Sequence, residues 1–503
     1  MEQEAAGLQA FAAEAAVGAE RVLVLGMGGS SLAPLVFADS FPVKPGGPRL
    51  EVLDSTDPES VLATARRSPP SRTIYVVSSK SGTTLEPNIL FDYFWDQAEK
   101  ELGGAAGSRF VVITDPGSAL EKEAGRRRVR RIFPGDPAIG GRYSALSHFG
   151  LVPAAFCGAD VSLLLRRARA MEEACRRTGS DNPGLLLGAA LGSLALQGRD
   201  KLTFDVGAPI PRFGMWIEQL VAESTGKEGR GILPVEGELL GPPESYGSDR
   251  VFVAIRQKND DASAESLSRL AANGHPVIRM DFEDAADLGG QMFLWEFATA
   301  VAGRLLDINP FDQPNVQEAK DRTNEILAGE GTAEQVKKEV RPGIDRDALA
   351  RLLASIGPGD YFAMMAYVQA SPENEERLSR PRLRVRDARA VATTVGFGPR
   401  FLHSTGQFHK GGPPTGVFLQ VTADPADEVP IPGRPFGFGR VLAAQAAGDL
   451  AALVSRNRRA LRVDLGRDVA GGLAELDRAV GAALAGAVPD GSAEKTGKDK
   501  ERA

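Results

Sequence analysis

Residues 73–88, TIYVVSSKSGTTLEPN, join an apolar strand pattern to a helical pattern through a polar loop. Ile74, Val76 and Val77 give the first half its strand character, and the helical pattern begins at about Thr84. Hydroxyl side chains, a lysine and a glycine lie between the two patterns. In a parallel sheet such a loop leaves the carboxyl end of a strand, where the next helix presents free amide groups. The stretch therefore predicts a β-α unit whose loop either binds an anion or simply caps the helix.

The same alternation of strand and helix patterns extends along most of the chain. The strand candidates of the first part are RVLVLGM, LEVLDS, TIYVVSS, RFVVITD and an outer VRRIFPG. A second group contains KLTFDV, RVFVAIR and PVIRMDF, and we expect the later DYFAMMAYV, GVFLQVTAD and RALRVDLG to complete its sheet. Short apolar strands that alternate with helices predict mostly parallel sheets covered by helices on both faces.

The pattern thus predicts an α/β fold made of two three-layer α/β/α domains, at residues 1–195 and 196–490. The polar, breaker-rich residues 491–503 are expected to be a disordered tail.

Composition narrows the classes of function. The net charge of -7, from 59 basic and 66 acidic residues, argues against a nucleic-acid partner. No apolar run approaches the roughly 20 residues that span a bilayer, so no membrane partner is expected. The acidic, alanine-rich start has none of the features of a signal peptide. Two cysteines cannot form a disulfide framework, which favours a cytoplasmic location.

A second loop of the same kind follows the first strand candidate, in VLGMGGSSLAP at residues 24–34. Its glycines do not have the spacing of a dinucleotide-binding motif. Because the carboxyl ends of neighbouring parallel strands lie at one edge of a sheet, the two loops are expected to converge on one compact oxyanion, such as a phosphate. The predicted phosphate-binding residues are Gly29, Ser30, Ser79, Lys80, Ser81, Thr83 and Thr84.

Four blocks along the chain resemble the phosphoglucose isomerases. SSKSGTT, with GMGGSS upstream, is similar to the phosphate loop of sugar isomerase (SIS) domains. IGGRYSALSHFGLVPAA resembles their GGR(F/Y)S segment, EQLVAESTGKEGRGILP their Q-x-x-x-E-S-x-G-K block, and NPFDQPNVQEAK the block that ends in their functional lysine. The layout is similar to the isomerase half of bacterial transaldolase–phosphoglucose isomerase fusions, and nothing in the chain resembles the transaldolase half. The resemblance implies that both predicted domains are of SIS type.

The resemblance also assigns roles that aldose–ketose isomerisation requires. Moving a proton between adjacent carbons needs a positioned carboxylate base, and Glu223 matches that residue of the family. The enediolate that forms needs a fixed cation, which Arg142 matches. Lys320 matches the lysine that assists ring opening. The expected sugar-binding residues are Gly141, Gln219 and Gln313.

The histidine of the family is displaced in this chain. Phosphoglucose isomerases usually place it between the glutamate and lysine blocks, where this sequence has only His275 in an unrelated context. The segment LHSTGQ at residues 402–407 resembles the missing motif but follows Lys320. We expect His403 to open the sugar ring. His409 is a second candidate, and an accidental similarity with a substitute residue elsewhere remains the alternative.

The resemblance therefore implies an isomerase that interconverts glucose 6-phosphate and fructose 6-phosphate through a cis-enediol, in glycolysis and gluconeogenesis. No cofactor is expected, because the reaction changes no net oxidation state, and the chain has no spacing typical of a metal site. The resemblance implies a homodimer. Two alternatives stay open: a sugar-phosphate sensor without turnover, and an isomerase of another hexose phosphate such as mannose 6-phosphate.

Overall fold

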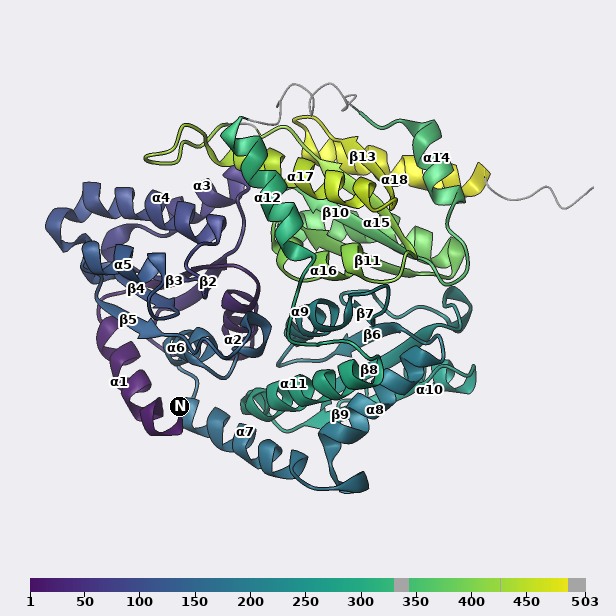
Figure 1. The fold of residues 1–503 in the computed structure, drawn as a ribbon, viewed down its shortest axis with the longest axis horizontal. Helices are drawn as coiled ribbons and strands as arrows, with labels where there is room; N and C mark the ends of the chain where they lie inside the picture. Colours follow the sequence, from purple (N-terminus) through teal and green to yellow (C-terminus); the bar gives the residue numbers. More distant parts are fainter. Residues whose placement is uncertain (330–342, 426, 487–503) are drawn as a thin grey trace, which may run out of the picture.

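A computed structural model describes residues 1–329, 343–425 and 427–486, and three sheets organise it (Figure 1). Every strand pair within these sheets is parallel. The predicted α/β class with parallel sheets is therefore confirmed. In Figure 1 the first sheet lies at the left in purple and blue, the second at the lower right in teal, and the third above it in green and yellow.

The first sheet has five strands in the order β2-β1-β3-β4-β5. Its strands β1 and β3 lie inside the sheet and are buried almost throughout, which accounts for their unbroken apolar sequences. The strands are β1 (Arg21–Gly26), β2 (Arg49–Leu53), β3 (Thr73–Ser78), β4 (Phe110–Thr114) and β5 (Arg131–Pro134). The helices of this part are α1 (Ala5–Ala15), α2 (Leu32–Ser40), α3 (Pro58–Arg67), α4 (Leu85–Leu102), α5 (Ala119–Arg126) and α6 (His148–Phe156).

The second sheet has four strands in the order β7-β6-β8-β9. Helix α11 packs against α7, α8 and α9 beside it. The strands are β6 (Lys201–Val206), β7 (Leu233–Val235), β8 (Arg250–Gln257) and β9 (Val277–Phe282). The helices are α7 (Val161–Cys175), α8 (Pro183–Leu196), α9 (Phe213–Thr225), α10 (Ala264–Ala272) and α11 (Leu288–Leu305).

The last part of the chain forms a third sheet, in the order β11-β10-β12-β13. The expectation that these strands complete the second sheet is wrong. A strand pattern shows that a segment is buried in a sheet but not which strands lie beside it, because pairing depends on packing between distant segments. The strands are β10 (Tyr361–Tyr367), β11 (Ala392–Phe397), β12 (Gly416–Thr422) and β13 (Arg459–Asp464). The helices are α12 (Val316–Ala328), α14 (Arg346–Ala354), α15 (Pro372–Arg389), α16 (Gly406–Gly411), α17 (Phe438–Ser455) and α18 (Val469–Gly486).

Successive side chains of β10 point to opposite faces of the third sheet, and the two faces pack into different hydrophobic clusters. Phe362 and Met364 face one hydrophobic cluster with side chains of α14, α15 and α18. Tyr361 and Met365 face another cluster, which also contains Ala222 at the end of α9. One face of the third sheet therefore has a core of its own, while the other face packs toward the second sheet.

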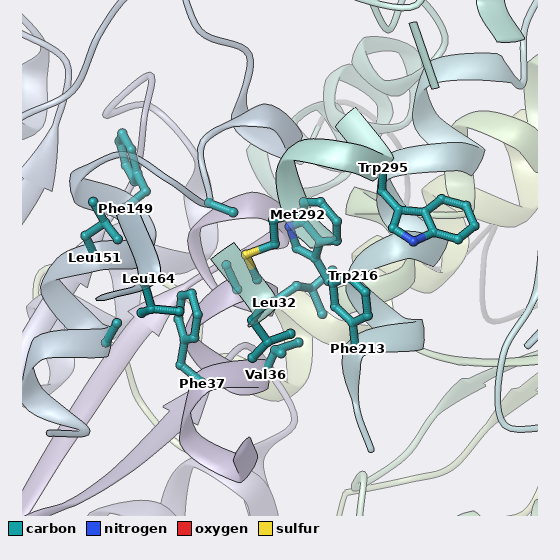
Figure 2. Close-up of a cluster of buried hydrophobic side chains, with 14 of the residues drawn as sticks. Leu32, Val36, Phe37, Phe149, Leu151, Leu164, Phe213, Trp216, Met292 and Trp295 are labelled. Carbon is teal, nitrogen blue, oxygen red and sulfur yellow. The ribbon is translucent and has the colours of Figure 1, made fainter. Parts of the chain in front are cut away.

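A further core joins the first two sheets. In Figure 2, Leu32 and Val36 of α2 lie beside Phe213 and Trp216 of α9, next to Met292 of α11. This packing holds α9 against the first sheet.

Three short 3-10 helices lie near the carboxyl edge of the first sheet: η2 (Gly28–Ser30), η5 (Gly141–Tyr143) and η9 (Arg400–His403). The predicted domain division at residue 195 stays a prediction, and the expected tail at 491–503 lies outside the described residues. Across the described part of the chain, no helix combines the length and apolarity needed to cross a lipid bilayer.

Candidate active site

A cavity of about 320 Å³ lies at the carboxyl edge of the first sheet, where the loops after β1 and β3 face helix α9. The predicted site residues all line it except Thr83, which lines an adjoining cavity of about 600 Å³. The two cavities share a wall that includes Lys320 and His403. Folding therefore brings together residues from every block that the sequence singled out.

Hydroxyl groups line the loop after β3. Ser79 is only 2% exposed, and its Oγ has no hydrogen-bond partner among the described residues. The Ser81 Oγ lies 3.0 Å from Thr83 Oγ1 and accepts a hydrogen bond from the Thr83 backbone N–H at 3.3 Å. Thr84 is the N-cap of α4. Hydroxyls and the free amides of a helix N-terminus thus share one edge, an arrangement that suits an oxyanion.

Lys80 is placed differently from the other residues of this loop. Its Nζ donates to Asp115 Oδ2 at 2.6 Å and to the carbonyl of Asp136 at 2.9 Å. The Lys80 charge is therefore partly neutralised within the protein, and hydroxyl and amide donors would carry more of the binding of an anion.

The glycine loop after β1 brings two parts of the site into close contact. A Cβ on Gly29 would lie 2.0 Å from the carbonyl oxygen of Gly141, so η2 and η5 can pack this closely only through glycine. Gly28 has a φ of +55°, and a Cβ there would lie 2.8 Å from Gln219 Nε2. These approaches place Ser30 opposite η5 and α9.

Arg142 is 2% exposed and held by several acceptors. Its Nε donates to Ser224 Oγ at 2.7 Å, and its Nη1 donates to Gln313 Oε1 at 2.9 Å. Its Nη2 donates to the carbonyls of Pro310 at 2.6 Å and Asp312 at 3.0 Å. The guanidinium is thereby fixed in place before a substrate arrives, as stabilisation of a developing charge requires.

Glu223 faces this guanidinium from the last turn of α9. Its Oε1 lies 3.6 Å from Arg142 Nη1, and its Oε2 accepts a hydrogen bond from Gln219 Nε2 at 3.0 Å. Gln219 precedes Glu223 by one helical turn, so both side chains lie on one face of the helix. The same Gln219 amide donates to the carbonyl of His403 at 2.8 Å, which links α9 to η9.

The lysine block is tied to the glutamate block by Lys227. Its Nζ donates to the carbonyl of Asn309 at 2.6 Å and to Asp312 Oδ1 at 2.7 Å. Burial lowers the pKa of Lys227 in spite of the Asp312 carboxylate. These bonds hold the loop that carries Gln313, and α12 then places Lys320 at the cavity.

His403 reaches the cavity from the third sheet and pairs with a glutamate of the first. Its Nε2 lies 3.1 Å from Glu86 Oε1. Arg400, in the same turn, donates to both carboxylate oxygens of Asp54 at 2.7 Å and so fastens η9 to the loop after β2. Burial acts to raise the pKa of Glu86, but the charge and hydrogen bond of His403 outweigh it and hold that pKa below its usual range.

The other histidines lie away from the cavity. His409 lies in α16 and packs against the third sheet, with Nδ1 3.0 Å from the Tyr361 hydroxyl, and burial lowers its pKa well below the usual range. His148 lies in α6, with Nδ1 2.7 Å from the carbonyl of Pro134. His275 packs against aromatic rings near β8.

Two residues around His403 escape the sequence analysis: Glu86 and Gln445. Glu86 follows the hydroxyl loop in the first turn of α4, where an acidic residue is expected simply to favour the helix dipole. Only the burial of its side chain distinguishes Glu86 from such an ordinary acidic residue, and burial cannot be seen in a single sequence. Gln445 lies in α17 and belongs to no motif, so nothing in the sequence could have pointed to it.

Within the part of the chain that the structure describes, no three His, Cys, Asp or Glu side chains gather in a way that could hold a metal ion.

Comparison with known proteins finds relatives of one family. The profile of the phosphoglucose isomerase family matches residues 7–231. A glucose-6-phosphate isomerase of Rubrobacter xylanophilus is 31% identical over 354 residues, which cover 60% of this chain and 81% of that protein. A probable glucose-6-phosphate isomerase of Haloarcula marismortui is 30% identical over 354 residues, covering 63% of this chain and 80% of its own.

Solved structures agree with the fold. A hypothetical protein from Thermus thermophilus has a TM-score of 0.59 at 26% identity, over 65% of this chain and 89% of its own. A glucose-6-phosphate isomerase from Chlamydia trachomatis has a TM-score of 0.55 at 22% identity, over 65% of this chain and 73% of its own. Both the sequence relatives and the arrangement of the site lead to one assignment: the chain belongs to the phosphoglucose isomerase family.

Proposed function

We propose that this protein interconverts glucose 6-phosphate and fructose 6-phosphate. The observation that carries the proposal is the pairing of Glu223 with Arg142 at 3.6 Å, in a cavity whose opposite wall is the hydroxyl loop after β3. The hydroxyls of Ser30, Ser79, Ser81, Thr83 and Thr84, with the amides at the start of α4, would hold the phosphate. Fixing the phosphate places the sugar carbons against the wall of the cavity that carries the carboxylate and the guanidinium.

Ring opening is the first chemical step. His403 donates a proton to the ring oxygen as its bond to the anomeric carbon breaks. As the carbonyl forms, the proton released by the anomeric hydroxyl replaces the one that His403 gave up, so no proton is gained or lost overall. Lys320 lines the same wall and contributes a positive charge near the oxygen atoms that change their bonding.

Proton transfer between C1 and C2 follows. Glu223 removes the proton from the carbon next to the carbonyl and returns it to the adjacent carbon, with an enediolate between the two transfers. Arg142 stabilises the negative charge on the enediolate oxygen, because its position is already fixed by Ser224 and Gln313. The hydrogen bond from Gln219 Nε2 fixes the orientation of the Glu223 carboxylate.

A coupled assay with fructose 6-phosphate tests the proposal. Glu223→Gln should lower kcat by about 100-fold or more, since the amide cannot accept the carbon-bound proton. It should leave the increase in Tm caused by the substrate, because phosphate binding does not need this carboxylate. Glu218→Gln on the same helix, which lines a different cavity, is the matched control and should keep its turnover. A wild-type protein that is folded but has no turnover would refute the proposal.

The same assay separates the alternatives. A sensor would show the increase in Tm with fructose 6-phosphate and no turnover. Turnover with mannose 6-phosphate in place of glucose 6-phosphate would assign the other hexose specificity.

We also infer a cytoplasmic enzyme of glycolysis and gluconeogenesis that assembles as a homodimer. Support for these comes from the family to which the chain belongs. Glu223 and His403, which the proposed reaction needs together, lie at one cavity of a single chain.

A further inference from the structure

A chain of buried hydrogen bonds connects the His403–Glu86 pair to Gln445, a glutamine of helix α17 beside the third sheet. Thr56 Oγ1 donates to Gln445 Oε1 at 2.7 Å. Gln445 Nε2 donates to Glu86 Oε1 at 2.8 Å, and the same carboxylate oxygen lies 3.1 Å from His403 Nε2. Thr56, Gln445 and Glu86 are 0%, 3% and 5% exposed, so water does not compete strongly for these bonds.

The direction of the Gln445 amide follows from its two neighbours. A carboxylate accepts hydrogen bonds but cannot donate, so the amide must turn its NH₂ group toward Glu86. The amide oxygen then faces Thr56, whose hydroxyl donates to it. Thr56 follows β2 and Gln445 lies in α17, so the orientation depends on contact between the first and third sheets.

Glu86 needs such a donor because it is buried. A carboxylate removed from water is stable in its charged form only when donors and positive charge surround it. His403, Gln445 and the nearby charge of Lys320 supply these around Glu86. Without the amide, less would hold the carboxylate at its present angle and in its charged form.

We propose that Gln445 is a positioning residue for ring opening: it holds the Glu86 carboxylate so that Glu86 fixes the His403 ring through Nε2 and leaves Nδ1 for the sugar. The inference rests on the proposed isomerase function and adds to it a residue from outside the family blocks. Gln445 acts through Glu86 and needs no contact with substrate. Ring opening depends on the resulting His403 geometry, whereas proton transfer by Glu223 does not.

The main test compares a cyclic substrate with an open-chain ligand. Gln445→Met keeps the length of the side chain but cannot donate to Glu86. Its kcat with fructose 6-phosphate should fall about tenfold, as expected for the loss of one hydrogen bond to a charged group, while KM changes less than twofold. Its affinity for 5-phosphoarabinonate, an open-chain acid that resembles the enediolate, should stay at the wild-type value. A general structural defect would lower both the kcat with fructose 6-phosphate and the affinity for 5-phosphoarabinonate.

The matched control is Gln420→Met. Gln420 is a fully buried amide of β12 that donates to the carbonyl of Ala446 in α17, the helix that carries Gln445. Gln420 lines neither cavity of the site. The Gln420→Met variant should therefore keep the wild-type kcat even if its Tm is lower. Equal losses of kcat in both variants would overturn the proposal.

Thr56 gives an independent test should Gln445→Met fail to fold. Thr56→Val removes the donor to Gln445 with little change in shape and should lower kcat about threefold, whereas Thr56→Ser keeps the hydroxyl and should restore it. The double variant of Thr56→Val and Gln445→Met should be no slower than Gln445→Met alone, because the residues act in one chain. Wild-type kcat in both Gln445→Met and Thr56→Val would overturn the positioning role.

A spectroscopic test does not depend on turnover. The chain has 4 histidines, so ¹⁵N NMR can assign the His403 ring. At a pH where the ring is neutral, the wild type should carry its single ring proton on Nε2, and Gln445→Met should show a mixture of the two ring tautomers. An unchanged His403 signal would refute the proposal. A wild type without turnover would instead refute the isomerase function.

Discussion

The guanidinium of Arg142 is bound on every side that does not face Glu223. A lysine in its place could not form the same fork of hydrogen bonds to Ser224, Gln313 and the backbone. Arg142→Lys should therefore lower kcat/KM about 100-fold, measured in the coupled assay, because the remaining charge would no longer be fixed beside the enediolate. Arg212→Lys, which alters an arginine paired with Asp39 at the start of α9, is the control. Near wild-type kcat/KM in Arg142→Lys would contradict the assigned role.

At the scale of single elements, the turn η2 depends on the absence of side chains. Gly28 has a φ of +55°, and its Cβ would meet Gln219 Nε2 at 2.8 Å and the His403 carbonyl at 3.1 Å. Gly28→Ala should displace the Gln219 amide and lower kcat at least tenfold, measured in the coupled assay, since a displacement near 1 Å in such a site can cost about 100-fold.

Gly46→Ala is the matched control for this prediction. Gly46 has a φ of +75° but nothing within 4 Å of its Cβ position. Both variants pay the backbone strain of a left-handed conformation, about 1 kcal/mol, and only Gly28→Ala adds a clash in the site. Equal kcat values in the two variants would show that the close packing of η2 has no effect on catalysis.

At the scale of the whole molecule, the third sheet delivers His403 to a site built mainly by the other two. Glu223 and His403 are joined within one chain by the Gln219 side chain. Mixing the Glu223→Gln and His403→Gln variants should therefore restore no activity. Each chain builds its whole site from its own residues, so every site in the mixture carries one of the two substitutions. If each site were shared between two chains, the mixture would regain up to about one quarter of wild-type kcat. About half of the dimers would then contain one chain of each variant, and one of the two sites in such a dimer would have both native residues. The measurement is kcat of the mixture after incubation under exchange conditions.

Another cavity, of about 500 Å³, lies where the three sheets meet, and the Glu218 side chain that lines it makes stability depend on pH. Burial, with the nearby Glu236 carboxylate, raises the pKa of Glu218 to about 8. The folded state therefore holds this proton more tightly than the unfolded state, where the pKa is about 4.3. The stabilisation is complete below the unfolded pKa and is lost as pH rises toward 8. Between pH 6 and pH 9 the loss should be about 3 kcal/mol.

Glu218→Gln tests this pH dependence. The variant should remove most of the Glu218 contribution and flatten the dependence of the free energy of unfolding on pH, measured by denaturant titration at each pH. Glu265→Gln, which changes a carboxylate in the first turn of α10, is the control and should leave the dependence unchanged. A Glu218→Gln variant with the wild-type slope would contradict the prediction.

Elements and motif blocks could be read from the sequence because their signals are local. The run of Val and Ile in β3, the hydroxyl loop after it and the capping residue Thr84 are neighbours in the chain. Glu223 and Gln219 share a face because four residues make about one helical turn.

Relations between distant segments were decided only by the tertiary structure. The strands β10 to β13 have the same apolar character as those of the second sheet, and only their packing against α14, α15 and α18 gives them a separate sheet. Likewise, LHSTGQ pointed to a histidine without its partner. The pairing of His403 with Glu86 depends on Arg400 and Asp54 across two sheets. Local sequence determines which conformation a segment adopts, whereas contacts between remote segments depend on how complete surfaces fit together, and these surfaces exist only after folding.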